Sequence, residues 1–108
     1  MSEQKTLISQ AFRTFVSEAP EHARAWGELV QSLSQASALD PKSSSLAYLA
    51  VLAALRLESG IPFHVKAAKG AGASREEIIS AILIGLPAAG HVVTQALPAA
   101  MTAFDMPD

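Results

Sequence analysis

Cysteine is absent from the 108 residues of this chain. The chain therefore has no disulfide, no thiolate metal site and no cysteine nucleophile. Charge is also scarce, since 17% of the residues are charged and the net charge is −2 at pH 7, whereas an average domain has about 25% charged residues. No segment is rich in Lys and Arg, so the positive surface that binding to nucleic acid requires is missing.

A hydrophobic leader is also missing at the N-terminus. The first residues, Met1–Lys5, are polar apart from Met1, and no apolar run of signal-peptide length follows them. We therefore expect a cytoplasmic protein. The residues from Ile78 to Phe104 carry no charge, and a stretch of that length is typical of a membrane span. Because Pro87 and Pro98 interrupt it, we expect no membrane span and assign it instead to a core or a subunit interface.

Half of the residues are hydrophobic, a high share for a chain of 108 residues. The length predicts one domain, residues 1–108. A monomer of this size leaves about a third or more of its unfolded-chain surface exposed. We therefore expect copies of the chain to assemble into a homo-oligomer, in which one subunit covers apolar residues of another.

Helical signals run along the whole chain, and no strand-like alternation of useful length occurs. Proline at positions 20 and 41 suits the first turn of a helix. Ser74-Arg75-Glu76-Glu77 has the form of a capping box. These signals predict an all-α bundle of five to six helices. Its first helix, over about Gln4–Ser17, lies in a peripheral N-terminal segment, residues 1–19.

Three details of these helices are predicted from short stretches or single residues. The run Leu46–Leu55 is apolar around its whole circumference, which predicts a central helix buried on nearly every side. Gly60 is expected to end that helix in the left-handed conformation. Pro98 is expected to kink a last helix, over about 88–104, by removing one backbone hydrogen bond.

The residues around position 60 resemble a known family signature. The run Leu57-Glu58-Ser59-Gly60-Ile61-Pro62-Phe63-His64, followed by Gly72-Ala73-Ser74-Arg75-Glu76-Glu77-Ile78, is similar to the carboxymuconolactone decarboxylase and AhpD-like family. In the peroxidase branch this signature reads Cys-x-x-Cys, three residues, His, and then Gly-Ala-(Ser/Thr)-x-Glu-Glu-Ile. The resemblance extends roughly from Pro20 to Phe104. It implies an AhpD-like helical bundle that assembles as a trimer or a hexamer.

Three of the four reactive positions of that branch differ here. Counted back from His64, the two cysteine positions fall on Leu57 and Gly60, and the position of the proton-relay glutamate falls on Ser45. The peroxidase branch needs a low-pKa thiolate to attack a peroxide and a second thiol to resolve the product. The peroxiredoxin-type antioxidant activity that family membership would imply is therefore excluded for this chain.

Several functions stay open once the thiol chemistry is excluded. The first is binding of a small molecule, with vestigial or altered catalysis, around His64. The second is a decarboxylase-like or isomerase-like activity on a small carboxylate or lactone, with His64 moving a proton. The third is a structural subunit that co-assembles with a cysteine-bearing relative, in which His64 satisfies a backbone carbonyl or the Ser45 hydroxyl.

The candidate site residues follow from these alternatives. His64 and Glu58 are the candidate catalytic groups, and Lys42 or Lys66 could pair with a substrate carboxylate. His91, Ser45 and Tyr48 are the candidate ligand-binding residues. Tyr48 and Trp26 fit core or interface positions better than substrate stacking. Two histidines without carboxylates at ligand spacing do not predict a metal, and no cofactor is expected.

Overall fold

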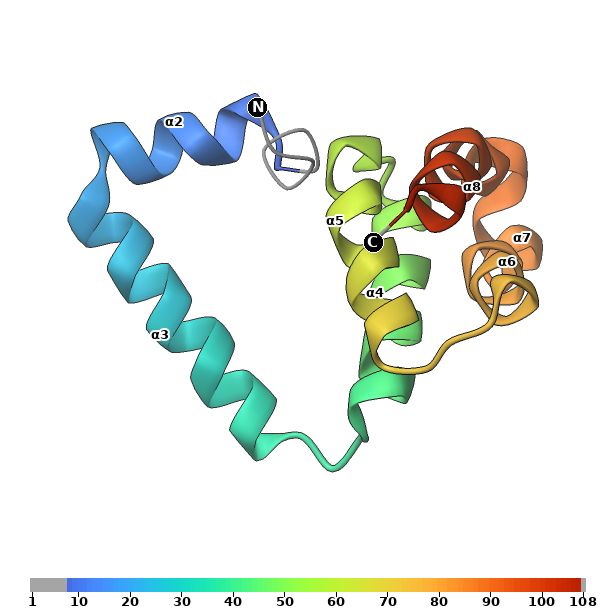
Figure 1. The fold of residues 1–108 in the computed structure, drawn as a ribbon, viewed down its shortest axis with the longest axis horizontal. Coiled ribbons are helices and arrows are strands. Elements are labelled where there is room, and N and C mark those ends of the chain that lie inside the picture. The colour runs from blue at the N-terminus through green and yellow to red at the C-terminus, as the bar shows by residue number, and fades with distance from the viewer. Residues whose placement is uncertain (1–7, 108) are drawn as a thin grey trace.

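The structure is a computed structural model that describes residues 8–107 (Figure 1). Over this range the chain forms helices and no strand, which confirms the prediction of an all-α bundle. The elements in chain order are α2 (Gln10–Glu18), α3 (Pro20–Ala36), α4 (Pro41–Ala54), the 3-10 helix η1 (Glu58–Gly60), α5 (Ile61–Gly70), α6 (Arg75–Leu83), α7 (Leu86–Ala89), the 3-10 helix η2 (Gly90–Ala96) and α8 (Leu97–Asp105).

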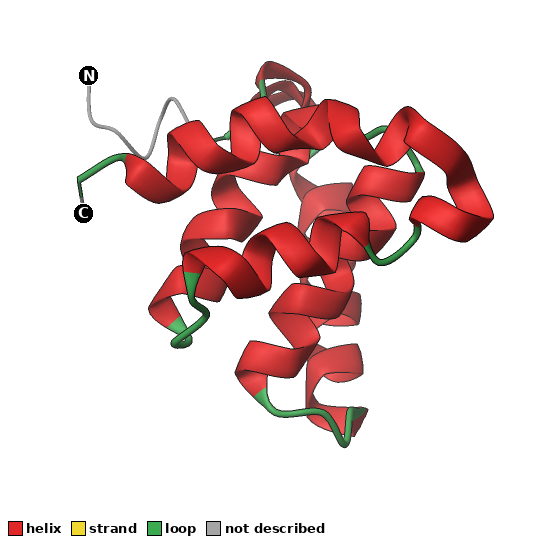
Figure 2. Ribbon diagram, turned by 90° about the vertical axis from the view of Figure 1, so that its right-hand side faces the viewer, coloured by secondary structure: helices red, strands yellow, loops and turns green. Residues whose placement is uncertain are grey.

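The helices form two parts, an arm and a bundle. The arm consists of α2 and α3, which swing away from the rest of the chain in Figure 1 and pack mainly on each other. The bundle consists of α4 to α8, whose helices cross one another closely (Figure 2). Neither α2 nor α3 contains a buried residue. The bundle therefore holds the core, and the arm extends one side of it.

Side-chain caps fix where several helices begin. Asp40 accepts a hydrogen bond from the Ser43 N–H (2.7 Å) at the start of α4. Ser74 and Glu77 form the predicted capping box at the start of α6, with the Ser74 hydroxyl and the Glu77 carboxylate each accepting from the other's N–H. Ser9 caps α2 in the same way, so that helix begins at Gln10. The predicted earlier start at Gln4 lies outside the described residues.

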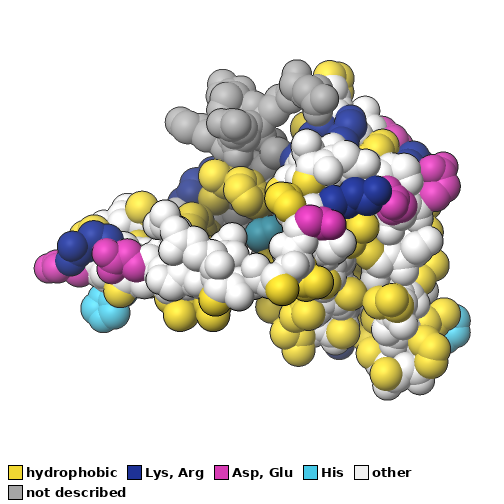
Figure 3. All heavy atoms as spheres, turned by 90° about the horizontal axis from the view of Figure 1, so that it is seen from below, with side chains coloured by type: hydrophobic (Ala, Val, Ile, Leu, Met, Phe, Trp, Pro, Cys, Tyr) yellow, Lys and Arg dark blue, Asp and Glu magenta, His cyan; other side chains and the backbone are white. Residues whose placement is uncertain are grey.

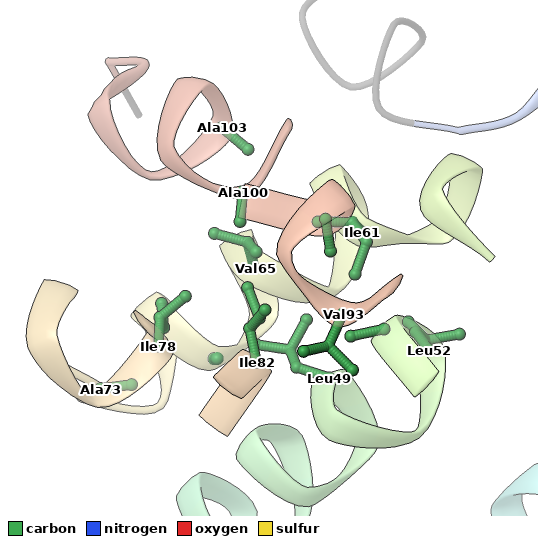
Figure 4. Packing of buried hydrophobic residues seen from close by; sticks show 13 residues of the cluster. Leu49, Leu52, Ile61, Val65, Ala73, Ile78, Ile82, Val93, Ala100 and Ala103 are labelled. Carbon is green, nitrogen blue, oxygen red and sulfur yellow. The ribbon is translucent and has the colours of Figure 1, made fainter. Parts of the chain in front are cut away.

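The core lies between α4, α5, α6, η2 and α8 (Figure 4). Its largest members have no exposed surface: Leu49, Ile61, Val65, Ile78, Ile82 and Val93. Small residues of α8, Ala100 and Ala103, let that helix approach the bundle closely. The uncharged stretch from Ile78 to Phe104 thus supplies much of the core. This agrees with the first of the two roles predicted for it, a core or a subunit interface.

One described helical stretch, Arg75–Asp105, is long and apolar enough to cross a membrane by length and composition alone. The chain folds this stretch into the consecutive elements α6, α7, η2 and α8, and α8 turns back to contact α6. It is therefore not one continuous straight helix. Some of its apolar side chains, among them Ile78, Ile82 and Val93, pack in the core of the bundle.

The prediction that α4 is buried on nearly every side is wrong for the single chain. Only Leu49, Leu52 and Ala53 of this helix are buried, whereas Tyr48 and Val51 are about half exposed. The reason is the position of α3. The two helices are joined by a turn, and α3 points away from α4 on the other side of it (Figure 1). One apolar face of α4 is left uncovered.

The prediction that Gly60 ends the central helix is also wrong. The helix ends at Ala54, and Arg56 takes the left-handed conformation with φ 62°. The Leu57 N–H then donates to the Leu52 carbonyl (2.9 Å), the bond that completes a Schellman-type end. Gly60 has φ −88° and belongs to η1 instead. A local hydrogen-bond pattern, rather than the nearest glycine, sets this boundary.

Pro98 does not kink a long last helix. It lies in the first turn of α8, where its missing N–H leaves no hydrogen bond unmade. The expected helix over 88–104 is divided earlier, at Gly90, whose φ of 81° ends α7. The segment Gly90–Ala96 follows as a 3-10 helix. Glycine in the left-handed region therefore makes the break that the sequence suggested for proline.

Candidate functional site

A cavity of about 560 Å³ lies between the arm and the bundle. The arm contributes Phe12, Trp26 and Val30 to its wall, and the bundle contributes Tyr48, Leu52 and His64. Figure 3 looks along this side of the molecule, and a histidine lies recessed in the hollow beside hydrophobic side chains. The cavity is thus formed by segments far apart in the sequence, because the N-terminal end of α2 lies on the side that faces α5 (Figure 1).

His64 lies in the first turn of α5, just after η1, and its ring packs between two aromatic rings. The centroid of Tyr48 on α4 lies 4.5 Å from that of His64, and the neighbouring Phe63 lies at 5.2 Å in an edge-to-face arrangement. Within residues 8–107 the imidazole forms no hydrogen bond, so the bond to Ser45 that a structural role would use is not made there. The ring packs on these two aromatic rings and lines the cavity.

The surroundings of His64 favour its neutral form. Burial lowers the pKa of this imidazole below its usual value of 6.5, because the charged ring loses hydration beside apolar side chains. No carboxylate opposes this effect through an ion pair among the described residues. At pH 7 the ring is therefore uncharged, with one nitrogen able to accept a hydrogen bond or a proton.

This depressed pKa predicts how stability depends on pH. Below 6.5 the unfolded chain binds a proton at His64 that the folded chain resists, so its contribution to stability, fully present above 6.5, is lost as the pH falls. The midpoint of thermal unfolding should therefore drop more between pH 7.5 and pH 5 for the wild type than for His64→Gln. An equal drop in both proteins would contradict the neutral-ring assignment.

No charged side chain of the described residues lines the cavity. Its polar groups are Ser9, Tyr48, Ser59 and His64, and the rest of the wall is apolar. Because an ionised group without a partner is costly to bury, such a wall disfavours a charged ligand. The cavity instead suits a largely apolar molecule with one or two hydrogen-bonding groups.

The structure brings together only some of the residues proposed from the sequence. Tyr48 and His64 share the cavity, whereas Ser45, Glu58 and His91 do not line it. Ser45 is half-buried on α4, Glu58 is half-buried in η1, and His91 is exposed in η2. The roles proposed for these three residues stay predictions, without a shared cavity to support them.

The two lysines considered as carboxylate partners are engaged away from the cavity. Lys42 forms an ion pair with Glu77 (2.8 Å), and the Lys66 ammonium donates to the Met106 carbonyl. Neither lines the cavity wall. In the described part of the chain, no three His, Asp or Glu side chains are grouped so that they could hold a metal ion.

The aromatic wall of the arm was not anticipated as part of the site. Phe12 and Trp26 make an edge-to-face contact at 5.4 Å and close the side of the cavity opposite the bundle. Trp26 is 44% exposed in the single chain, so it is not a core residue, and its predicted place in an interface stays a prediction. The apolar residues around Trp26 in the sequence recur at helical spacing. This spacing is the same for a helix that lines a cavity and for one that packs in a core, so it does not distinguish the two.

Leu57 and Gly60, at the two cysteine positions of the resemblance, both line the cavity. A Cβ atom at position 60 would lie 3.9 Å from Cδ2 of His64. The edge of the site that would carry thiols in the peroxidase branch is therefore an apolar wall here.

One family model matches the chain. It is that of the carboxymuconolactone decarboxylase family, and it covers residues 20–104, which include α3 and all of the bundle except the last residue of α8. None of the curated proteins matches the chain.

Proposed function

Since the chain belongs to the carboxymuconolactone decarboxylase family, we propose that it is a cysteine-free member that binds a small uncharged molecule beside His64. The observation that carries this proposal is a neutral imidazole recessed in an apolar and aromatic cavity. The binding step needs no thiol, so the lack of cysteine does not weaken it.

The size and wall of the cavity support a ligand of one or two rings. Its volume of about 560 Å³ falls within the range of about 300–1,000 Å³ typical of small-molecule sites. Phe12, Trp26, Tyr48 and Phe63 offer ring faces and edges against which an aromatic or aliphatic body packs. Binding then comes mainly from removing apolar surface of the ligand from water.

The polar groups favour a hydroxyl or an amide over a carboxylate. The His64 and Tyr48 rings contact each other where α4 packs on α5, and both residues line the cavity. Each can exchange a hydrogen bond with a neutral ligand group. A carboxylate would need a cation in the wall, and the described wall has none. A neutral imidazole is also a base, so a bound alcohol or carbon acid would meet a proton acceptor.

Trp26 provides a direct test, because it is the single tryptophan of the chain and lines the cavity. Benzyl alcohol and benzoate share a ring and differ in charge. We expect benzyl alcohol to change the Trp26 fluorescence saturably at pH 7.5, with a dissociation constant of about 1 mM for so small a ligand. Benzoate should bind at least about tenfold more weakly, because its charge is buried without a partner.

Two matched variants make this experiment decisive. His64→Gln should weaken benzyl alcohol binding while leaving the melting temperature at pH 7.5 nearly unchanged. His91→Gln carries the same substitution at an exposed residue outside the cavity wall, and should bind like the wild type. Equal binding of the alcohol and the carboxylate, or equal binding by His64→Gln, would refute the proposed ligand class. A lower melting temperature for His64→Gln with no change in binding would identify His64 as structural.

A further inference from the structure

The cavity beside His64 has one wall on the arm and one on the bundle, and both walls are partly exposed to solvent. Four aromatic side chains of these walls are each 37–48% exposed. They are Phe12 and Trp26 on the arm, and Tyr48 and Phe63 on the bundle. Small-molecule sites usually bury about 70–90% of the surface of a drug-sized ligand. With the arm in this position, the walls therefore cover a ligand only in part.

The arm joins the bundle through one short connector, residues 37–40. All four residues are exposed, and the backbone is extended at both ends, with ψ 139° at Ser37 and ψ 166° at Asp40. The Leu39 N–H donates to the Ser37 hydroxyl (3.1 Å), and the Ser37 N–H donates to the Ser34 carbonyl (3.3 Å), so these hydrogen bonds stay within the connector and the end of α3. A few exposed residues between two helices are typical of a hinge.

The arm can turn about this connector as one body. Its two helices pack mainly on each other, and Phe12 and Trp26 join them through an edge-to-face contact at 5.4 Å. Because neither helix contains a buried residue, such a rotation uncovers no core side chain. A rotation towards the bundle brings apolar walls together, and no charged side chain of the described residues lines either wall to oppose their approach.

We propose that the arm is a lid, which turns about residues 37–40 and closes on a molecule bound beside His64. This inference rests on the proposed function, because a ligand favours the closed position only through contacts that it gains there. Phe12 and Trp26 supply these contacts from the arm. Ser9 adds a polar group, since its hydroxyl oxygen accepts from the Phe12 N–H (3.1 Å) and its proton stays available to a ligand acceptor.

The lid adds α2 to the parts of the chain that select the ligand. Ser9 and Phe12 precede residues 20–104, which the family model matches. Closure removes water from the bound molecule on the arm side as well as on the bundle side. A neutral ring gains apolar contact from this step, whereas a carboxylate loses its hydration without meeting a cation in the described wall. Neutral ligands should therefore close the lid, and carboxylates should not.

The distance between two spin labels, measured by pulsed electron paramagnetic resonance, tests this proposal. The chain has no cysteine, so Glu18→Cys with Ser80→Cys places one label at the end of α2 and one on α6, at exposed residues outside the cavity wall. The labelled protein is refolded from urea with an excess of unlabelled protein, so that only distances within one chain are measured. Benzyl alcohol, at a concentration that saturates the Trp26 signal of the unlabelled protein, should shorten the mean distance by more than about 2 Å, as hinge closures on binding do. Benzoate at the same concentration should leave the distance unchanged.

Two matched variants show whether the arm closes on the ligand itself. Phe12→Ala removes a ring from the arm wall and should lose the shortening. Phe15→Ala removes a ring from the same helix, but one that does not line the cavity, and should keep the shortening. A label pair within the bundle, Ser80→Cys with His91→Cys, should not respond to benzyl alcohol in any of these proteins.

The outcomes separate the lid from the proposed function. An unchanged or longer distance, together with a saturable Trp26 signal, would overturn the lid and leave the proposed function standing. An equal shortening in Phe12→Ala would also overturn the lid, because the arm would then move without contacting the ligand. If benzyl alcohol gave no saturable Trp26 signal, the proposed function and the lid would both be wrong.

Discussion

Val93→Asp is expected to unfold the chain. Val93 lies in η2 with no exposed surface, among the side chains at the centre of the core (Figure 4). Burying an unpaired charge at such a place costs about 3–5 kcal/mol, and small domains have only about 5–15 kcal/mol of stability in total. The variant should therefore lose most of its cooperative unfolding transition at 25 °C, measured by circular dichroism in urea.

An aspartate at Ile84 shows whether burial, rather than the lack of charge in this stretch, causes the expected loss of stability. Ile84 belongs to the same uncharged stretch, but it is 72% exposed at the end of α6. Ile84→Asp should change the free energy of unfolding by no more than about 0.5 kcal/mol, as surface substitutions usually do. If Val93→Asp unfolded at the same urea concentration as Ile84→Asp, the core position of η2 would be wrong.

Helix positions were largely predictable because their signals are local. Asp40-Pro41 and the Ser74–Glu77 capping box each fix a helix start through hydrogen bonds within four residues. The end of α4 differs from the prediction, because Arg56 and not the nearby Gly60 takes the left-handed conformation. The deciding bond, from the Leu57 N–H to the Leu52 carbonyl, forms around a residue other than glycine in the left-handed conformation, and residue type alone does not predict this.

The placement of the arm was not predictable from the sequence. The apolar residues of α3 and α4 indicate that each helix has a side to bury, and the spacing is the same whether the cover is the same chain or another. The sequence therefore placed α4 inside the bundle on all sides. In the structure the arm diverges from α4, which leaves Val51 and Leu55 uncovered and opens the cavity beside Tyr48.

The candidate site was predicted in part, for a comparable reason. His64 and Tyr48 meet because α4 and α5 pack on each other, and both residues were named from the sequence. Phe12, from outside the matched residues 20–104, and Trp26 complete the cavity. No local pattern links an aromatic residue of α2 to a histidine of α5, because only the path of the arm brings them together.

The wild type is expected to show no turnover of an alkyl hydroperoxide with a dithiol reductant. Peroxide reduction needs a thiolate that becomes a sulfenic acid, a second thiol that converts it to a disulfide with loss of water, and a dithiol that restores both. Leu57 and Gly60 offer no sulfur. Turnover above the buffer rate, in protein free of other peroxidases, would contradict this expectation.

Leu57→Cys with Gly60→Cys should form a disulfide but give little peroxidase activity. The Gly60 N–H donates to the Leu57 carbonyl (3.0 Å), which closes a turn with its Cα atoms less than about 7 Å apart, within reach of a disulfide. A Cβ atom at position 60 also fits, since its nearest neighbour, a Leu52 methyl group, lies at 3.6 Å. Mass spectrometry under oxidising conditions should detect the loss of two hydrogens.

Adding Ser45→Glu to that pair should raise the turnover by at least about a hundredfold, the lower end of what positioned acid–base groups contribute. The resemblance places a proton-relay glutamate at position 45, and His64 alone is a neutral base without a carboxylate partner in the described chain. Ser45 lies on α4, one turn before the Tyr48 that packs on His64. Leu57→Cys with Gly60→Ser and Ser45→Glu is the matched control, because it keeps one thiol and the relay but cannot form the disulfide, and it should not turn over. If the two-cysteine variant alone reached the rate of the triple variant, position 45 would have no relay role.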